Sequence, residues 1–315
     1  MRARQTSTPS KHGHEFLREM RRHRTLYLMC LPALLLLLAL CYIPLGGVWM
    51  AFTEFKLLDG IFGSKFVGLD KFRLFFISDV ALRSVANTLI INAWGLLLGL
   101  LFPVSLAVAL NELRQGLFKR ITQGVMFFPY FLSWVVVGAI SWALFNTDLG
   151  VVNTLYKSLG MKPVRWLAEG RYWKGFLIAF NVWKWSGYNS ILYLAAMANF
   201  DPYLFEAAEV DGANKWQRIV HLTLPMLKPT AVTLALLSIG RIFFGDFGMV
   251  WGIIGNNGVL LPWVQVVDTY VYTTMRTLGF SYSTAVGLMQ SVLGLIMVLG
   301  ANALAKRIND GEGLF

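Results

Sequence analysis

Apolar residues along the chain fall into long blocks that shorter polar segments separate. Six blocks occur, and they cover approximately residues 26–52, 86–111, 124–146, 176–199, 229–254 and 284–305. A helix of about 20 apolar residues crosses the roughly 30 Å hydrocarbon core of a membrane. The pattern therefore predicts an all-α polytopic membrane protein, with six transmembrane helices in one membrane domain over residues 25–308.

The distribution of lysine and arginine predicts how these spans are oriented. Basic residues mark the N-terminal segment 1–24, the connections 112–123 and 200–228, and the C-terminal end at Lys306 and Arg307. With six spans these four segments lie on one side of the membrane, and the positive-inside rule assigns that side to the cytoplasm. The segment 1–24 and the tail 309–315 are therefore predicted to be cytoplasmic.

The composition agrees with a membrane protein, because 56% of the residues are hydrophobic, 14% are charged and the mean hydropathy is +0.57. A net charge of +11 also occurs in proteins that bind nucleic acid. Here, however, the basic residues lie in the connections between apolar blocks rather than on one recognition patch. The sequence thus indicates membrane lipid around the chain and argues against a nucleic-acid partner.

The connection 200–228 has the pattern of two short helices joined by a turn. Asp201-Pro202 places a capping carboxylate and an N1 proline at the start of a helix, and Gly212 allows the chain to turn. A second amphipathic piece follows, and Leu224-Pro225 is predicted to end it. Such a helix pair either docks in a groove of a partner protein or lies on the membrane surface, and the residues alone leave both alternatives open.

The same stretch resembles the EAA loop of binding-protein-dependent ABC importer permeases. Glu206, Ala207, Ala208, Gly212, Leu222, Leu224 and Pro225 match its pattern at the family's spacing, and Asp211-Gly212-Ala213 is typical of the carbohydrate-uptake (maltose-type) branch. Further similarity to the oligosaccharide and polysaccharide members lies in Leu31-Pro32, Tyr42-Ile43-Pro44, Asn87-Thr88-Leu89, Asp268-Thr269-Tyr270 and Glu312-Gly313-Leu314-Phe315. Unlike the best-known maltose member, the chain lacks a large folded insert on the outer side.

The resemblance implies a MetI-like (type I) permease fold and a multi-pass subunit of the bacterial cytoplasmic (inner) membrane. The subunit would pass an oligo- or polysaccharide across the membrane by alternating access. The residues that would couple it to an ATPase are Glu206, Ala207, Ala208, Asp211, Gly212, Ala213, Leu222, Leu224 and Pro225. The implied partners are a second homologous permease subunit, two copies of an ABC ATPase and an extracytoplasmic substrate-binding protein.

No motif in the chain supports catalysis by the chain itself. The phosphate-binding pattern G-x-x-x-x-G-K-[ST] is absent, and so are H-E-x-x-H and C-x-x-C metal motifs. We therefore expect no enzymatic activity and no cofactor on this chain. By the resemblance, ATP and Mg²⁺ would bind to the separate ATPase subunits.

Charged residues are costly within spans and by default face a cavity or a partner. In the six apolar blocks they are Lys184, Arg241 and Asp246. One hypothesis is a sugar-lined pathway, which an acidic sugar such as a uronate of the alginate type would suit; its candidate residues are Asn181, Trp183, Lys184, Trp185, Tyr188, Arg241 and Asp246. The alternative is that the charges form ion pairs between helices.

Two other classes of protein also have spans with internal charges. One is a self-contained secondary transporter or channel, in which the charges act as a relay, and the other is a membrane scaffold or assembly subunit. No internal repeat occurs in the sequence, so the inverted repeats of many secondary transporters are not supported.

Overall fold

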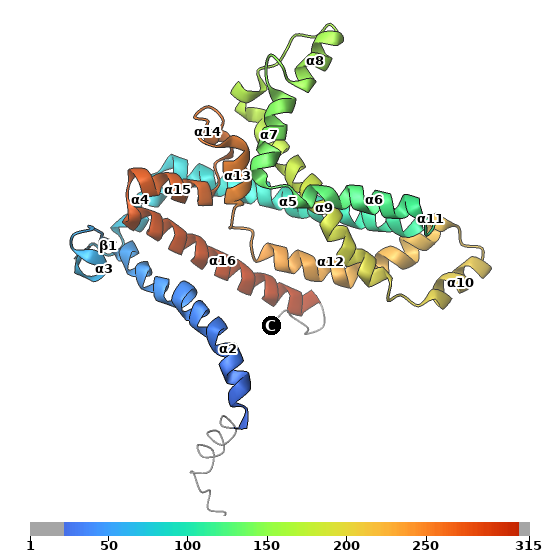
Figure 1. The fold of residues 1–315 in the computed structure, drawn as a ribbon, viewed down its shortest axis with the longest axis horizontal. Coiled ribbons are helices and arrows are strands. Elements are labelled where there is room, and N and C mark those ends of the chain that lie inside the picture. The colour runs from blue at the N-terminus through green and yellow to red at the C-terminus, as the bar shows by residue number, and fades with distance from the viewer. Residues whose placement is uncertain (1–21, 309–315) are drawn as a thin grey trace, which may run out of the picture.

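The computed structural model describes residues 22–308. The predicted N-terminal segment is thus described only from Arg22 onward, and the predicted tail 309–315 lies outside the described residues. Figure 1 shows helices α5, α12 and α16 running along the molecule, with α2 reaching out from one edge and α7 and α8 standing off another. The all-α prediction is confirmed, apart from one small hairpin.

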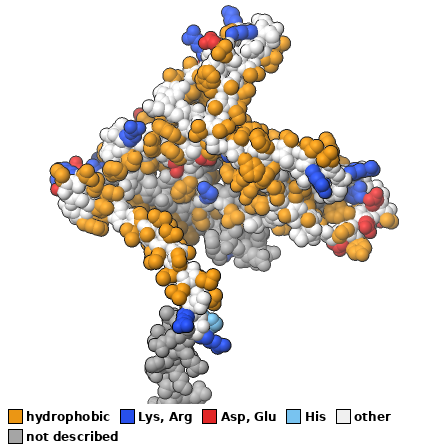
Figure 2. All heavy atoms as spheres, viewed as in Figure 1, with side chains coloured by type: hydrophobic (Ala, Val, Ile, Leu, Met, Phe, Trp, Pro, Cys, Tyr) orange, Lys and Arg blue, Asp and Glu red, His pale blue; other side chains and the backbone are white. Residues whose placement is uncertain are grey.

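The first apolar block forms one helical run of α2 (Arg24–Leu37), the π-helical turn η1 (Leu38–Tyr42) and the 3₁₀ segment η2 (Ile43–Phe52). Helix α2 buries none of its residues, and Leu28, Met29 and Leu36 are among its exposed apolar side chains. Figure 2 shows hydrophobic side chains along its length. An apolar surface of this extent requires a covering of lipid or of another subunit.

The connection after the first run is compact. It contains the hairpin of β1 (Thr53–Glu54) and β2 (Lys65–Phe66), in which Thr53 pairs with Phe66 and Glu54 with Lys65. The other elements of this part are α3 (Gly60–Gly63) and α4 (Asp70–Ile77).

The middle of the chain runs from α5 to α9. In order its elements are α5 (Asp79–Glu112), α6 (Leu117–Phe127), η3 (Phe128–Phe131), α7 (Trp134–Phe145), α8 (Val151–Ser158), η4 (Trp166–Ala168), η5 (Gly170–Tyr172) and α9 (Trp173–Met197). Helices α5 and α9 pack against each other along most of their length.

The last third begins with the connection 200–228 and ends in α16. Its elements are α10 (Pro202–Val210), α11 (Lys215–Arg218), the π-helical turn η6 (Ile219–Thr223), α12 (Leu224–Ile239), α13 (Phe247–Ile254), α14 (Leu261–Val264), α15 (Val267–Thr277) and α16 (Phe280–Ile308).

Within residues 22–308, four helical runs are long and apolar enough to cross a membrane: Arg24–Phe52, Asp79–Glu112, Lys215–Ile239 and Phe280–Ala303. A fifth is counted if Leu117–Phe131 and Trp134–Phe145, bent by 101° at a short break, form one span. Helix α9 has 25 residues but is less apolar, because Asn181, Lys184 and Asn189 lie within it. The four runs and the bent pair correspond to the first, second, third, fifth and sixth predicted spans. Helix α9 corresponds to the fourth, which is more polar.

The fifth predicted span, 229–254, is not one helix. Helix α12 ends at Ile239, and α13 begins only at Phe247 after an irregular segment of residues 240–246. The physical reason is local, because Asp246 caps the new helix with its carboxylate, which accepts a hydrogen bond from the Met249 N–H. In the other direction the helical run extends back to Lys215.

The buried core is divided along the bundle. The central cluster joins α5, α9 and α13 and includes Ile91, Leu177, Val182, Met249 and Val250. One end is closed by a cluster of Phe75, Ala81, Val267, Tyr270, Tyr282 and Val286, and the other by Ala107, Tyr193, Met197 and Leu227. The central cluster fixes α9 between α5 and α13.

Helices α7 and α13 approach each other at two glycines. A Cβ atom on Gly138 would lie 2.2 Å from the Gly252 carbonyl oxygen, and one on Gly252 would lie 2.9 Å from the Trp134 backbone. Small residues permit such close backbone packing between helices in lipid. The contact joins the second half of the bent span to α13.

We therefore expect Gly138→Ala to destabilise the purified protein by about 1–3 kcal/mol, because the added methyl group separates α7 from α13. Thermal unfolding in detergent measures the effect. Gly99→Ala on α5 is the matched control, since nothing lies within 4 Å of its Cβ position. Equal melting temperatures for the two variants would contradict the packing described here.

Candidate functional site

Helix α10 is started by the residues that the sequence suggested. The Asp201 carboxylate accepts a hydrogen bond from the Tyr203 N–H at 3.0 Å, and Pro202 occupies the first turn. The helix ends at Asp211, after which Gly212 has a φ of +81°. A residue with a Cβ adopts this left-handed conformation only at a cost. Nothing lies within 4 Å of the Cβ position of Gly212, so the turn requires glycine for its backbone conformation and not for lack of room.

The second piece begins with a reciprocal cap. The Asn214 side chain accepts from the Gln217 N–H, and the Gln217 side chain accepts from the Asn214 N–H. The prediction that Leu224-Pro225 ends this piece is wrong, because the helix continues through them into α12. The π-helical turn η6 lies directly before Pro225 and carries the chain past a residue that has no N–H to donate.

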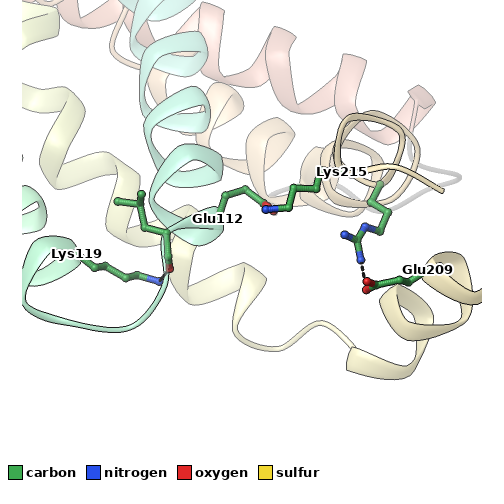
Figure 3. A network of polar contacts seen from close by, with 6 residues as sticks. Glu112, Lys119, Glu209 and Lys215 are labelled. Atoms are coloured by element: carbon green, nitrogen blue, oxygen red, sulfur yellow. Dashed lines mark hydrogen bonds and ion pairs between the residues drawn. The ribbon is translucent and has the colours of Figure 1, made fainter. Parts of the chain in front are cut away.

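Two ion pairs fasten the helix pair (Figure 3). The Arg218 guanidinium contacts the Glu209 carboxylate at 2.6 Å and so joins α11 to α10. The Lys215 ammonium lies 4.0 Å from the Glu112 carboxylate at the end of α5. Close to this end, Lys119 donates to the Leu113 carbonyl oxygen at 3.5 Å. The pair is therefore joined within itself and attached to the end of α5.

One face of α10 is exposed in the described chain. Tyr203, Glu206, Ala207 and Val210 recur at helical spacing and are all exposed, with Tyr203 at 76% and Val210 at 87%. We call this set the outer face of α10. On the other side, a hollow of about 370 Å³ separates the two helices, and it is lined by Ala208, Asp211, Gly212, Ala213, Gln217, Arg218, His221 and Leu222.

The predicted coupling residues thus occupy three places. Glu206 and Ala207 lie on the outer face, and Leu224 and Pro225 lie in the first turn of α12. The remaining five, which line the hollow, are Ala208, Asp211, Gly212, Ala213 and Leu222.

A second site is a cavity of about 520 Å³ inside the bundle, between α5, α9, α12, α13 and the segment 240–246. Four of the seven predicted pathway residues line it: Asn181, Trp185, Arg241 and Asp246. Trp183, Lys184 and Tyr188 do not. Arg241 is exposed and makes no ion pair among residues 22–308.

The irregular segment 240–246 forms part of the cavity wall and is held by polar side chains from three helices. The Asn92 amide of α5 donates to the carbonyl oxygens of Ile242 and Phe244, at 2.7 and 2.8 Å. The Gln290 amide of α16 donates to the Phe243 carbonyl oxygen at 2.8 Å. The carbonyl groups that a helix would have paired are thus paired by side chains.

The Asp268 carboxylate of α15 completes this arrangement. It accepts hydrogen bonds from the Gly245 N–H at 2.6 Å and from the Gln290 amide at 3.0 Å. Burial raises the pKa of the Asp268 carboxyl, while the two hydrogen bonds favour its charged form. Next along the chain, Asp246 accepts from the Trp134 indole N–H at 2.9 Å, so the far end of the segment is tied to α7.

Lys184 is 6% exposed, and its ammonium group is surrounded by backbone carbonyl oxygens and aromatic rings. Its ammonium group donates to the carbonyl oxygens of Pro129, Tyr130 and Leu132, at the 101° bend between η3 and α7. The rings of Tyr130, Trp134 and Trp185 lie within 6 Å of the charge. A cation at the end of a helix neutralises the negative end of its dipole and pairs its free carbonyls.

The other two predicted pathway residues face elsewhere. Tyr188 stacks on Tyr130, with ring centroids 4.4 Å apart and an angle of 12° between the planes. Trp183 is exposed and borders an apolar groove between α7 and α9. Both contribute to packing around the bent span.

Sequence reasoning missed Asn92, Asp268 and Gln290, which hold the cavity wall. Asn92 and Gln290 are uncharged amides within apolar blocks, and an inspection limited to charged residues passes over them. A search for every strong hydrogen-bonding side chain in a span finds both, because such groups are also costly in lipid unless they are paired. Asp268 stood out in the sequence only as part of the similarity at Asp268-Thr269-Tyr270.

Comparisons with known proteins agree with this architecture. Residues 95–310 match the family described as "Binding-protein-dependent transport system inner membrane component". The chain is 37% identical over 304 residues to the protein LplB of Bacillus subtilis (strain 168), which covers 96% of this chain and 95% of that protein. It is also 37% identical to the polygalacturonan/rhamnogalacturonan transport system permease protein YteP of that organism, over 92% and 90% of the two chains.

Solved structures are similar as well. A chain of a bacterial ABC transporter involved in the import of the acidic polysaccharide alginate superposes with a TM-score of 0.84 at 30% identity, over 93% of this chain and 99% of that chain. A chain of the alginate transporter in complex with its periplasmic protein, which holds an alginate pentasaccharide, gives a TM-score of 0.83 over 94% and 99%.

The chain therefore belongs to the family of inner-membrane components of binding-protein-dependent transport systems. Within that family it is the permease subunit of an ABC importer, located in the inner membrane, and the ATPase is a separate subunit. The predicted permease fold is confirmed by the superposition. This membership rules out the two other classes that the sequence left open, a self-contained secondary transporter or channel and a membrane scaffold.

We expect Lys184→Met to lower the stability of the protein by about 3 kcal/mol, because buried carbonyl groups at the bend lose a charged donor. Thermal unfolding of the purified chain in detergent measures this. Lys174→Met, at the start of the same helix and partly exposed, is the matched control and should unfold close to the parent. Unchanged stability of the Lys184→Met protein would show that the ammonium group does not secure the bend.

Proposed function

We propose that the chain forms one half of a carbohydrate pathway and couples it to ATP hydrolysis through α10. The proposed complex contains a second homologous permease subunit, two copies of an ATPase that bind ATP and Mg²⁺, and an extracytoplasmic substrate-binding protein. Relatives named for polygalacturonan, rhamnogalacturonan and alginate support a polysaccharide or its fragments as cargo. The periplasmic protein present with the alginate transporter supports the last of these partners.

The observation that carries the proposal is the outer face of α10. Tyr203, Ala207 and Val210 offer apolar contact around the carboxylate of Glu206, and no described residue covers them. A helix that lies on a membrane surface carries lysine and arginine on its polar face. Helix α10 carries only acidic charges, Glu206 and Glu209, so the balance favours docking in a groove with a basic residue opposite Glu206.

The helix pair is well placed to transmit movement to the cavity. Residues from Lys215 to Ile239 form one uninterrupted helical run, and the segment 240–246 with Arg241 follows directly. A displacement of the docked pair would therefore move the cavity wall along the axis of this helix. Alternating access in the proposed cycle would use that connection.

The cavity chemistry fits an acidic sugar. Arg241 supplies a cation without an ion pair among the described residues, Trp185 supplies a ring face and Asn181 supplies an amide. An arginine pairs a carboxylate through two parallel hydrogen bonds. We propose that these residues contact an acidic oligosaccharide during its passage, whereas Lys184, committed to three carbonyl groups, supports the bend.

Glu206→Lys in the assembled, reconstituted importer should reduce substrate-stimulated ATPase activity about tenfold or more, since like charges at an interface cost several kcal/mol. Gly212→Pro should have a similar effect, because proline cannot adopt a φ of +81°. Both proteins should still insert into the membrane. Glu54→Lys, a charge reversal in the hairpin β1, is the control and should leave coupling intact. Normal stimulation in both α10 variants would refute the assigned role.

Arg241→Gln should raise the KM for uptake of an acidic oligosaccharide about tenfold, which corresponds to the loss of a charge-assisted hydrogen bond. Uptake by whole cells supplied with labelled uronate oligomers measures it. The companion Lys184→Met variant should show reduced amounts of protein with an unchanged KM. A KM for acidic sugars that does not respond to Arg241→Gln would count against acidic cargo in this cavity.

A further inference from the structure

Residues 146–172, between α7 and the start of α9, form a side arm that stands off the helix bundle (Figure 1). The arm contains α8, η4 and η5. Neither the cavity nor the helix pair uses its residues. Its interior and its surface have distinct compositions, and both bear on what the arm contacts.

The interior of the arm is rigid because one buried amide organises it. Asn153 is fully buried, and its amide group donates to the carbonyl oxygens of Asn146, Thr147 and Val164, at 3.3, 3.0 and 2.8 Å. Its own carbonyl oxygen accepts from the Val164 N–H and from the Trp166 indole N–H. The surface of the arm is thus presented on a fixed frame.

The aromatic residues of the arm point inward. Trp166 is buried, and its ring contacts those of Phe145, Tyr156 and Tyr172. Its carbonyl oxygen accepts from the Trp173 indole N–H at 2.7 Å. These rings therefore form a core that closes the arm, in which Trp166 is buried and Tyr156 and Tyr172 are half-buried.

The surface of the arm carries an aliphatic stripe. Val151 and Leu155 on α8 and Leu159 at its C-cap recur every four residues and are all exposed, with Leu159 at 65%. Leu149, 80% exposed, precedes them and Met161 follows. We call these five residues the aliphatic stripe. The helix that leads into the arm, α7, has exposed apolar side chains too, so the arm continues an apolar membrane segment.

Basic side chains border the stripe. Lys157, Lys162 and Arg165 are exposed and make no ion pair among residues 22–308, although Lys157 donates to the Asp148 carbonyl oxygen. The acidic residues of the arm are Asp148 and Glu169, and the latter pairs with Arg171 at 3.1 Å. Figure 2 shows the Lys and Arg side chains gathered around the tip of the arm, beside hydrophobic ones.

We propose that the side arm is a lipid-binding element that lies in the membrane–water interface, with the aliphatic stripe in the acyl region and Lys157, Lys162 and Arg165 on lipid phosphates. Aliphatic side chains flanked by lysine and arginine are the composition of interfacial segments, in which long basic side chains reach the headgroups. Lysine is depleted at protein–protein interfaces. The stripe is bordered by two lysines and one arginine, so lipid is the favoured occupant.

Anchoring the arm would also fix the part of the bundle to which it is joined. A Cβ on Gly170 would lie 2.1 Å from the Trp263 ring, so η5 is seated directly against α14. The Asn257 amide donates to the Leu167 carbonyl oxygen at 3.4 Å. Through α7 the arm is further joined to α13 at Gly138 and Gly252. Lipid contact would therefore steady α13, which the cavity residue Asp246 caps.

Quenching by brominated lipid tests the position of the arm. The assembled importer, with Cys30→Ser and Cys41→Ser, receives a fluorescent label through Leu155→Cys and is reconstituted in phosphatidylcholine vesicles with or without phosphatidylglycerol. We expect brominated acyl chains to quench the label, and quenching to be at least about twofold stronger with phosphatidylglycerol, since basic residues near the surface are attracted to anionic lipid. Leu28→Cys on α2 should be quenched in both vesicles, and Val210→Cys on α10 in neither.

Charge reversal separates the basic residues from the stripe. The triple charge reversal Lys157→Glu, Lys162→Glu and Arg165→Glu should abolish the dependence on phosphatidylglycerol. The same reversal of Lys56, Lys65 and Arg73, in the connection after the first helical run, should preserve it. A Leu155→Cys label that bromolipid does not quench, while the Leu28→Cys label is quenched, would overturn the proposal. A label that is shielded only when the substrate-binding protein is added would overturn it as well. Quenching at Val210→Cys would instead contradict the docking role of α10 and leave the arm unaffected.

Discussion

Inside a membrane the backbone has no water to bond, so wherever a helix is interrupted the protein must supply the missing partners. This chain interrupts its helices twice around one centre. At the bend after η3, the Lys184 ammonium group pairs the free carbonyls. In the segment 240–246, Asn92, Gln290 and Asp268 pair the backbone from three different helices. Both interruptions are therefore built into the bundle, and the cavity is the space that the second one borders.

These interruptions relate the two sites to each other. The helix pair at one end is clamped by Glu209–Arg218 and by Lys215–Glu112, and its second helix continues without a break to Ile239. The irregular segment begins directly after that residue, with Arg241 in the cavity wall. On the far side, Asp246 and Trp134 connect the segment to α7 and α13. A permease subunit of an ABC importer needs such a path between its ATPase side and its cargo.

The sequence was sufficient where the cause is local. Apolar blocks predicted the long helices, and Asp201, Pro202 and Gly212 predicted where α10 starts and turns. It failed where neighbours decide. Leu224-Pro225 looked like a helix end, but the π-helical turn before it keeps the run intact. For Lys184 the sequence left a pathway residue and an interhelical ion pair both open, because its partners, three carbonyl groups some 50 residues away, have no sequence signature. Asn92 and Gln290 carry no charge and drew no attention, although they hold the cavity wall.

In the coupling proposed above, the run Lys215–Ile239 moves as a rigid rod and the chain flexes at 240–246. Distances between spin labels in the reconstituted importer, compared with and without bound ATP, test it most directly. Exposed positions Trp216 and Leu237 report on the rod, and Leu237 and Val259 report across the irregular segment. We expect a constant distance for the first pair and a shift for the second. A shift between Trp216 and Leu237, with Leu237 and Val259 unchanged, would place the hinge at η6 and contradict it.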